Sequence, residues 1–345
     1  MGTLQNGPTP GGVRTNLAEV LPLKTPFMIQ IFPVYGCNFR CGYCIYALDK
    51  SKHGYISDVT FMDIELYKKC IDDMKNFNRP LKMIRFAGIG EPLLHPRIDE
   101  MVAYSKQAGV AQSIDIVTNA SLLTKSLSDA LISAGLTKLR ISLEGLSDQD
   151  YKRNSKATVN FENMVSQIRY FHEQAKETQV YIKIIDYMVQ DLEDRQRFFE
   201  LFSPICDQIS VEHLTPTIKE IDYDTLSGGM KTDKPQNAER LLDSQICPEP
   251  FYMMQINADG KVVPCCSMEY PIVMGDTNKQ NVERIWNGQN FNQFRLALLD
   301  GNQNASRVCE KCNLYIYGMY EEDVLDENAQ HLKKLFQALL IRNKR

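Results

Sequence analysis

The stretch GCNFRCGYCIY, residues 36–46, contains three cysteines within eight positions, Cys37, Cys41 and Cys44. It follows the apolar run FMIQIFP (27–33), which predicts a buried β-strand. Thiolates grouped on one loop are common ligands of iron–sulfur clusters. A structural zinc ion usually takes four protein ligands, and no fourth ligand follows at zinc-like spacing. The three thiols therefore favour a four-iron cluster with one iron open to another ligand, and zinc is the alternative.

The composition restricts the class of protein. The chain has 345 residues, of which 43% are hydrophobic and 24% charged, and its net charge is −4. These values are ordinary for a globular protein and give no sign of nucleic-acid or membrane binding. No apolar run reaches the roughly 18 residues of a membrane span, and the first residues lack the core of a signal peptide. Ten cysteines without a secretory signal indicate metal binding or reactivity in the cytoplasm rather than disulfides.

Six strand-like runs alternate with helical patterns along the first two thirds of the chain. The runs are 27–33, 82–88, 113–119, 138–145, 180–188 and 207–214. Such alternation predicts an α/β fold with a parallel sheet and right-handed crossovers. Six units fall short of the eight of a closed barrel, so we expect a partial (β/α)6 barrel. The residues that could bind ligands or react follow the strand ends, where parallel α/β folds form their sites.

Changes in pattern divide the chain into five segments. Residues 1–26 are rich in Gly, Pro and polar residues and are expected to form a flexible leader. The barrel is expected over 27–216 and a linker over 217–246. Residues 247–318 are expected to form a small domain with a β-hairpin turning at Asp259-Gly260. The charged helical pattern of 319–345 predicts a C-terminal helix.

The cysteine loop and the motifs after later strands together resemble the radical S-adenosylmethionine (SAM) superfamily. The resemblance covers about residues 27–215. Tyr43 matches the aromatic position near the adenine, and GIGEP (88–92) matches the motif that binds the methionine ammonium group, with Ile89 inserted between the glycines. Ser142 and Glu144 of SLEG match contacts to the ribose and the SAM carboxylate, and Arg153 lies where related enzymes carry a basic residue. The resemblance therefore implies these cofactor-binding residues: Tyr43, Gly88, Gly90, Glu91, Pro92, Thr118, Asn119, Ser142, Glu144 and Arg153.

The resemblance also implies the chemistry. A [4Fe–4S] cluster bound by the three cysteines would reduce SAM, and the resulting 5′-deoxyadenosyl radical would abstract a hydrogen atom from a substrate. The cofactor performs this step, while the protein places the substrate and excludes water. We expect a small-molecule substrate, a flavodoxin or ferredoxin as electron donor, and an oxygen-sensitive cytoplasmic protein.

Four further cysteines, Cys247, Cys265, Cys309 and Cys312, form a second set. Taken alone, they are compatible with zinc or with an iron–sulfur cluster, because ligand identity does not separate the two. The spacing C-x12-G-x4-C followed by C-x2-C resembles the auxiliary-cluster extension called SPASM or, when shortened, twitch. No cysteine follows Cys312, so the pattern is truncated and implies one auxiliary [4Fe–4S] cluster with four protein ligands. Cys266 is expected to be a spare, packed as a small hydrophobic residue; the less favoured alternative is that it replaces Cys265 as a ligand.

The leading functional hypothesis is dehydrogenation of a small polyol, sugar or amino sugar, with the auxiliary cluster as electron acceptor. This layout resembles that of the 2-deoxy-scyllo-inosamine dehydrogenase-like enzymes. Alcohol oxidation needs a base, and Glu212 and His213, at the end of the sixth run, are the first candidates. Lys183, Asp186 and Tyr187 are rivals.

Three alternatives stay open. A radical sugar epimerase would return a hydrogen atom from a thiol, for which Cys206 is the candidate, although a buried structural cysteine is the simpler interpretation. A modifier of ribosomal peptides is less favoured, because only about 26 residues precede the first strand. A non-enzymatic zinc or iron–sulfur scaffold explains the cysteines but not GIGEP or SLEG.

Overall fold

A computed structural model of the chain describes residues 2–4, 14–53, 57–237, 240–266 and 269–342. Within them, ten strands form one sheet in the order β1-β7-β6-β5-β4-β3-β2-β8-β9-β10. The strands are β1 (Thr3–Leu4), β2 (Met28–Ile31), β3 (Leu81–Phe86), β4 (Ala111–Thr118), β5 (Lys138–Leu143), β6 (Gln179–Ile185), β7 (Gln208–Glu212), β8 (Met253–Ile256), β9 (Lys261–Val263) and β10 (Gly275–Asp276).

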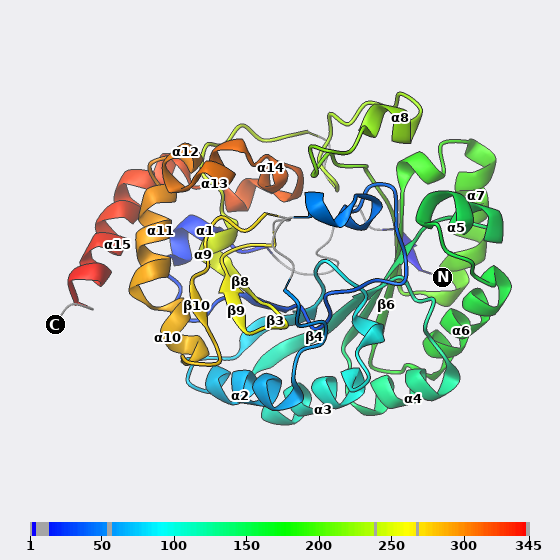
Figure 1. The fold of residues 1–345 in the computed structure, drawn as a ribbon, viewed down its shortest axis with the longest axis horizontal. Helices are drawn as coiled ribbons and strands as arrows, with labels where there is room; N and C mark the ends of the chain where they lie inside the picture. The colour runs from blue at the N-terminus through cyan, green and yellow to red at the C-terminus, as the bar shows by residue number, and fades with distance from the viewer. Residues whose placement is uncertain (1, 5–13, 54–56, 238–239, 267–268, 343–345) are drawn as a thin grey trace.

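Strands β2 to β7 correspond to the six predicted runs and are all parallel neighbours in chain order. Helices cover the outer face of this curved sheet in an arc (Figure 1). They are α2 (Ile64–Met74), α3 (Ile98–Ala108), α4 (Lys125–Ser133), α5 (Asp148–Ser155), α6 (Phe161–Gln174) and α7 (Leu192–Phe202). The predicted α/β fold with a partial barrel is confirmed, and the strands' carboxyl ends all lie at one mouth.

The two faces of the parallel strands differ in chemistry. Apolar side chains such as Ile84, Ile116 and Ile141 are at most 1% exposed and pack under the helices. The alternate positions are mostly polar; Arg85, Ser142 and Lys183 are half-buried, whereas Asp115, Arg140 and Glu212 are buried. Since successive side chains on a strand point to opposite faces, this second set points into the barrel. The barrel therefore has a polar, partly accessible interior.

Strand β8 extends the barrel sheet in a way the sequence pattern did not predict. It pairs in parallel with β2, so Gln255 lies beside Gln30, and their side-chain amides are hydrogen-bonded at 2.6 Å. The chain then turns at Asp259-Gly260, where Gly260 has φ +83°, and returns as antiparallel β9. The predicted hairpin is thus present, and its first strand lies beside β2, the strand that leads into the three-cysteine loop.

The segments expected as leader and linker pack against the rest of the fold. Helix α1 (Leu17–Val20) buries Leu17, and β1 pairs with β7. The Arg14 guanidinium lies 3.7 Å from the centre of the Tyr320 ring. Of the expected leader, residues 1 and 5–13 lie outside the described residues, and 14–26 include the buried residues Leu17, Leu21 and Leu23. In the expected linker, α8 (Tyr223–Ser227) lies over the cysteine loop, where a Cβ on Gly42 would be 2.7 Å from the Leu226 side chain.

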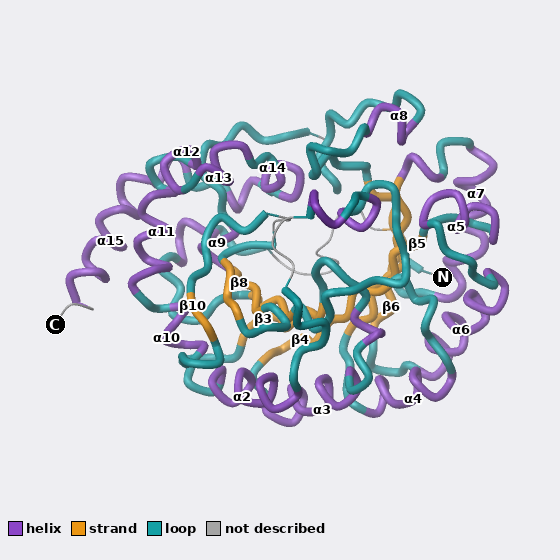
Figure 2. The backbone as a smooth tube through the Cα atoms, viewed as in Figure 1, coloured by secondary structure: helices purple, strands orange, loops and turns teal. Residues whose placement is uncertain are grey.

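The C-terminal third combines strands β8 to β10 with several helices (Figure 2). Its helices are α9 (Glu249–Tyr252), α10 (Val282–Trp286), α11 (Gln289–Leu298), α12 (Asn302–Ala305), α13 (Arg307–Lys311), α14 (Leu314–Gly318) and α15 (Ala329–Arg342). Single turns of 3-10 helix are η1 (Ile45–Ala47), η2 (Lys50–Lys52), η3 (Pro92–Leu94), η4 (Asp186–Met188), η5 (Ser203–Ile205), η6 (Glu321–Asp323) and η7 (Asp326–Asn328). Helix α10 is joined to α2, because Asp73 accepts hydrogen bonds from Asn281 and Val282. Among the described helices, none has the length and apolarity needed to cross a membrane.

Candidate functional site

The three-cysteine loop lies at the carboxyl end of β2. It is anchored to α5, because the backbone N–H groups of Arg40 and Gly42 donate to the carbonyls of Ser155 and Asn154 at 2.7 and 3.0 Å. The Phe39 N–H donates to Cys37 Sγ at 3.4 Å. Burial raises the pKa of Cys37 to about 12 and also raises the pKa of Cys41 and Cys44. Without a metal, burial favours the protonated form of these thiols. A bound metal would displace the protons, so buried thiols beside N–H donors suit the role of thiolate ligands.

The GIGEP motif packs directly on this loop. The Glu91 N–H donates to the Gly36 carbonyl at 2.9 Å, and the Tyr46 hydroxyl donates to the Ile89 carbonyl at 3.0 Å. A Cβ on Gly90 would lie 2.1 Å from the Val34 carbonyl oxygen. We expected the glycines to admit a ligand, but at Gly90 the closely approaching group is the backbone of the cysteine loop. The motif therefore supports the shape of that loop.

Replacing Gly90 with alanine is expected to distort the loop, because neither backbone in the contact can retreat without moving a cysteine. We expect a loss of about 3 kcal/mol in unfolding free energy, together with lower iron retention after reconstitution. The matched control is Gly36→Ala, where the nearest atom to the added Cβ is a Val34 side-chain carbon at 3.7 Å. Denaturant unfolding and iron analysis check the pair, and equal behaviour of the two variants would contradict the packing argument.

The Glu91 carboxylate is 2% exposed and binds the end of β4. It accepts hydrogen bonds from the Thr118 hydroxyl at 2.7 Å, the Asn119 N–H at 2.8 Å and the Leu93 N–H at 2.9 Å. Burial raises the pKa of Glu91 to about 7 despite these donors. The structure thus brings three candidate residues, Glu91, Thr118 and Asn119, into contact. Pro92 begins η3 beside them. A contact between Glu91 and a methionine ammonium group stays a prediction.

Tyr43 and Glu144 meet on the other side of the mouth. The Tyr43 hydroxyl donates to Glu144 Oε1 at 2.6 Å, and Glu144 Oε2 is buried without a hydrogen bond to a described residue. Burial raises the pKa of Glu144 to about 7. Ser142 is half-buried two residues earlier on the inner face of β5. An unsatisfied carboxylate oxygen beside the cysteine loop fits a polar ligand bound at this mouth.

A contact between Arg153 and the cofactor stays a prediction. The Arg153 side chain is 67% exposed on α5, and its guanidinium donates to Asp150 at 2.7 Å. Nothing in this geometry supports a contact with the cofactor.

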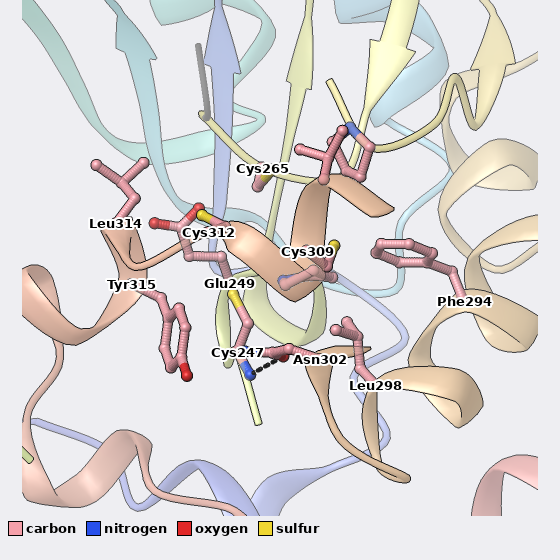
Figure 3. A pocket seen from close by; sticks show the side chains of 13 residues that line it. Cys247, Glu249, Cys265, Phe294, Leu298, Asn302, Cys309, Cys312, Leu314 and Tyr315 are labelled. Atoms are coloured by element: carbon pink, nitrogen blue, oxygen red, sulfur yellow. Dashed lines mark hydrogen bonds between the residues drawn. The ribbon is translucent and has the colours of Figure 1, made fainter. Parts of the chain in front are cut away.

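The four cysteines of the second set line one pocket. They come from separate segments, since Cys247 precedes α9, Cys265 follows β9, Cys309 lies on α13 and Cys312 follows it. Figure 3 shows the four side chains around the same space, with the Cys247 N–H donating to Asn302 Oδ1 at 2.8 Å. Burial raises the pKa of Cys247 well above its usual value. The donor set fits a cluster with four protein ligands.

Cys266 is not among the residues that line this pocket. Its thiol lies 3.7 Å from both carboxylate oxygens of Glu249. In the described part of the chain, no three His, Cys, Asp or Glu side chains converge as ligands of one ion. The family match reported below, not this absence, distinguishes a cluster from a single ion.

The structure separates the two candidate bases. Glu212 lies on the inner face of β7, where its carboxylate accepts hydrogen bonds from Lys183 Nζ at 2.6 Å and Tyr181 at 3.1 Å. Gln236, from the segment expected as a linker, donates to the same carboxylate at 2.7 Å. Alternation turns His213 away from that face, and its Nδ1 lies 2.5 Å from Asp186 Oδ2. His213 therefore joins the ends of β6 and β7.

Cys206 lies before β7, at the amino end of the strand, and is 3% exposed. Gly2 covers it, because a Cβ there would be 2.6 Å from Cys206 Sγ. The barrel mouth is at the opposite end of the strand. We therefore do not propose Cys206 as a hydrogen donor.

Comparison with known proteins agrees with this geometry. Residues 31–202 match the model of the radical SAM superfamily, and residues 247–313 match that of an iron–sulfur cluster-binding domain, SPASM. The chain is 22% identical over 287 residues to the S-adenosyl-L-methionine-dependent 2-deoxy-scyllo-inosamine dehydrogenase of Niallia circulans, covering 83% of this chain and 92% of the relative. It is 37% identical over 110 residues to the tungsten-containing aldehyde ferredoxin oxidoreductase cofactor-modifying protein of Pyrococcus furiosus, covering 32% of this chain and 28% of that protein.

Among solved structures, BtrN in complex with AdoMet and 2-DOIA shares the fold. The TM-score is 0.54 at 19% identity, covering 86% of this chain and 96% of that one. The two matched domains imply that the chain binds SAM and [4Fe–4S] clusters; that the two cysteine sets are the ligands stays a prediction.

Proposed function

Since the chain belongs to the radical SAM superfamily and carries a SPASM-type domain, we propose that it oxidises an alcohol carbon of a small polyol, sugar or amino sugar. The observation that carries this proposal is the convergence of four cysteines from separate segments on one pocket. A four-iron cluster bound by four protein ligands has no open iron position for a substrate. A cluster in this pocket would therefore suit electron transfer. The match to an inosamine dehydrogenase over 92% of that relative supports the same reaction.

When bound, SAM and the first cluster supply a radical that abstracts hydrogen, and the auxiliary cluster supplies an electron acceptor. Oxidation of an alcohol also releases a proton from the hydroxyl, and the chain must accept it. Glu212 is our candidate for this role, because it lies on the inner face and binds Lys183. Lys183 Nζ, at 2.6 Å, holds the carboxylate in place on the inner face. Gln236 fixes the same carboxylate from the segment above the mouth.

Glu212→Gln is expected to lower product formation about 100-fold, while 5′-deoxyadenosine is still released. The amide keeps the shape of the side chain but accepts no proton at neutral pH. His213→Asn is the matched control, since it changes the neighbouring residue without touching the inner face. The ratio of oxidised product to 5′-deoxyadenosine checks the prediction, because a structural defect would lower both. Glu212→Gln alone leaves the Lys183 charge unpaired, which could destabilise the fold. The double variant Glu212→Gln/Lys183→Met removes that charge and so separates loss of catalysis from loss of stability.

The proposed function is tested by incubating the reconstituted, anaerobically reduced protein with SAM and a panel of polyols, sugars and amino sugars. We propose that a flavodoxin or ferredoxin supplies the electron in the cell, and dithionite replaces it here. A product lighter by two hydrogens, formed with equimolar consumption of SAM, supports dehydrogenation. Solvent deuterium at an inverted carbon would replace the proposal with epimerisation. Modification of a peptide, with every small alcohol inert, would replace it with peptide maturation.

A further inference from the structure

Arg85 lies on β3, on the inner face of the barrel, between Gln30 of β2 and Asp115 of β4. No hydrogen bond or ion pair joins its guanidinium to a described residue, and its Nε is buried without a partner. The two terminal nitrogens are not among the buried unpaired atoms of the described residues, so burial orphans only one of the five N–H donors. The terminal nitrogens therefore face open space, where a ligand can bind them.

The carboxylate nearest in the sheet is already committed. Asp115 is fully buried, and it accepts hydrogen bonds from Arg140 Nε at 2.8 Å and from the Ser113 hydroxyl. Asp115 still attracts Arg85 electrostatically, although its hydrogen bonds go to other groups. The charged residues on the inner faces of β3 to β7 are Arg85, Lys138, Arg140 and Lys183 against Asp115 and Glu212. These strand faces thus carry more cations than anions, and burial together with Arg140 lowers the pKa of Arg85 to about 10.

The space in front of Arg85 is accessible. Its neighbours on the outer face, Ile84 and Phe86, are 0% exposed, whereas Arg85 is only half-buried. Val117, Ser142 and Lys183, also on the inner face, are half-buried as well. A ligand that enters through the mouth, between the cysteine loop and the strand ends, can therefore reach the guanidinium.

We propose that Arg85 binds an anionic group of the substrate, a carboxylate or a phosphate, inside the barrel. A guanidinium matches the planar oxygen pairs of both groups through two parallel hydrogen bonds. The inference rests on the proposed function only in placing the substrate inside the barrel. It narrows the substrate class to sugar or polyol acids and phosphates. Amino sugars are disfavoured, because their ammonium group would meet Arg85 and Lys183.

The test uses the full-length, anaerobically reconstituted protein with SAM bound. Inorganic phosphate and glycolate serve as probes at constant ionic strength, with chloride as the reference. Modification of Arg85 by phenylglyoxal is followed by peptide mass spectrometry. We expect at least one probe to slow the modification about tenfold, and the more protective probe identifies phosphate or carboxylate as the natural group. An unchanged rate with both probes would overturn the inference.

Variants separate recognition from a structural role. Arg85→Met should lose probe binding measured by calorimetry and should melt at the same or a higher temperature, because it removes an unpaired buried charge. Arg295→Met is the matched control. Arg295 is also buried, but it donates to the Pro250 and Trp286 carbonyls, so its loss should lower the melting temperature. Arg85→Met melting as low as Arg295→Met would assign Arg85 to the structure and contradict the inference.

The outcome is distinguishable from failure of the proposed function, because probe protection needs no turnover. Protection without any alcohol oxidation leaves the anion site in place and removes only the proposed reaction. Oxidation of a neutral or cationic substrate, at equal rates in the wild-type protein and Arg85→Met, removes only the anion site.

Discussion

Replacing Cys41 with alanine is expected to abolish the release of 5′-deoxyadenosine from SAM. Cys41 is 9% exposed in the loop between β2 and η1, and the other two thiols of the trio flank it in sequence. Two remaining thiolates cannot hold a four-iron cluster in place. The protein should lose about four iron atoms per chain and should keep those of the second set. Iron and sulfide analysis, with chromatography of the SAM products, checks both expectations.

The matched control is Cys70→Ala, which removes a buried cysteine on α2 that belongs to neither set. It should retain iron and SAM cleavage, with a stability loss typical of a small core truncation, about 1 kcal/mol. Full release of 5′-deoxyadenosine by Cys41→Ala would mean that the trio does not bind the cluster that cleaves SAM.

The paired replacement of Cys309 and Cys312 with alanine is expected to separate SAM cleavage from product formation. Both residues lie in the same pocket as Cys247 and Cys265, and their removal leaves two ligands of four. We expect iron content to fall by about half, 5′-deoxyadenosine to form still, and the oxidised product to disappear. The physical reason is that the radical can still be generated, while the substrate electron has no acceptor.

Cys266→Ala provides the control for this pair. Cys266 adjoins Cys265 in the sequence but contacts Glu249 instead of lining the pocket. It should retain both iron and product. Product formation at the wild-type rate by the Cys309/Cys312 double variant would show that the second cluster does not accept the substrate electron. Loss of product in Cys266→Ala alone, with full iron content, would indicate that the Cys266 thiol is needed for product formation.

The sequence predicted the barrel strands and both cysteine sets because these features are local. The apolar pattern of a strand such as 113–119 can be recognised within the strand itself. The spacing of the three cysteines can likewise be recognised within eight positions. The pairing of β8 with β2 was missed, because the partner strands are more than 200 residues apart and no local pattern encodes their register. The packing of residues 14–26 was missed for the same reason. Their polar composition suggested a leader, whereas Leu17 and Leu23 are buried against distant segments.

For the candidate site, the sequence predicts which residues take part better than it predicts how they are arranged. The pair Glu212 and His213 could be separated only once contacts to Lys183 and Asp186 fixed which residue points inward. The role of Gly90 depends on a backbone contact with Val34 that the motif alone does not reveal. Arg85 was overlooked, although a signal was present. In KMIRFAG (82–88) it alternates with Ile84 and Phe86, and an arginine on the inner face of a buried strand needs an explanation.

The central claim is that Cys37, Cys41 and Cys44 hold a cluster whose open iron binds and reduces SAM. The most direct measurement is incubation of the anaerobically reconstituted wild-type protein with dithionite and SAM, followed by quantification of methionine and 5′-deoxyadenosine. The account predicts equimolar release of both, from a brown protein that contains sulfide as well as iron. A colourless protein that binds zinc without sulfide and leaves SAM intact would contradict it.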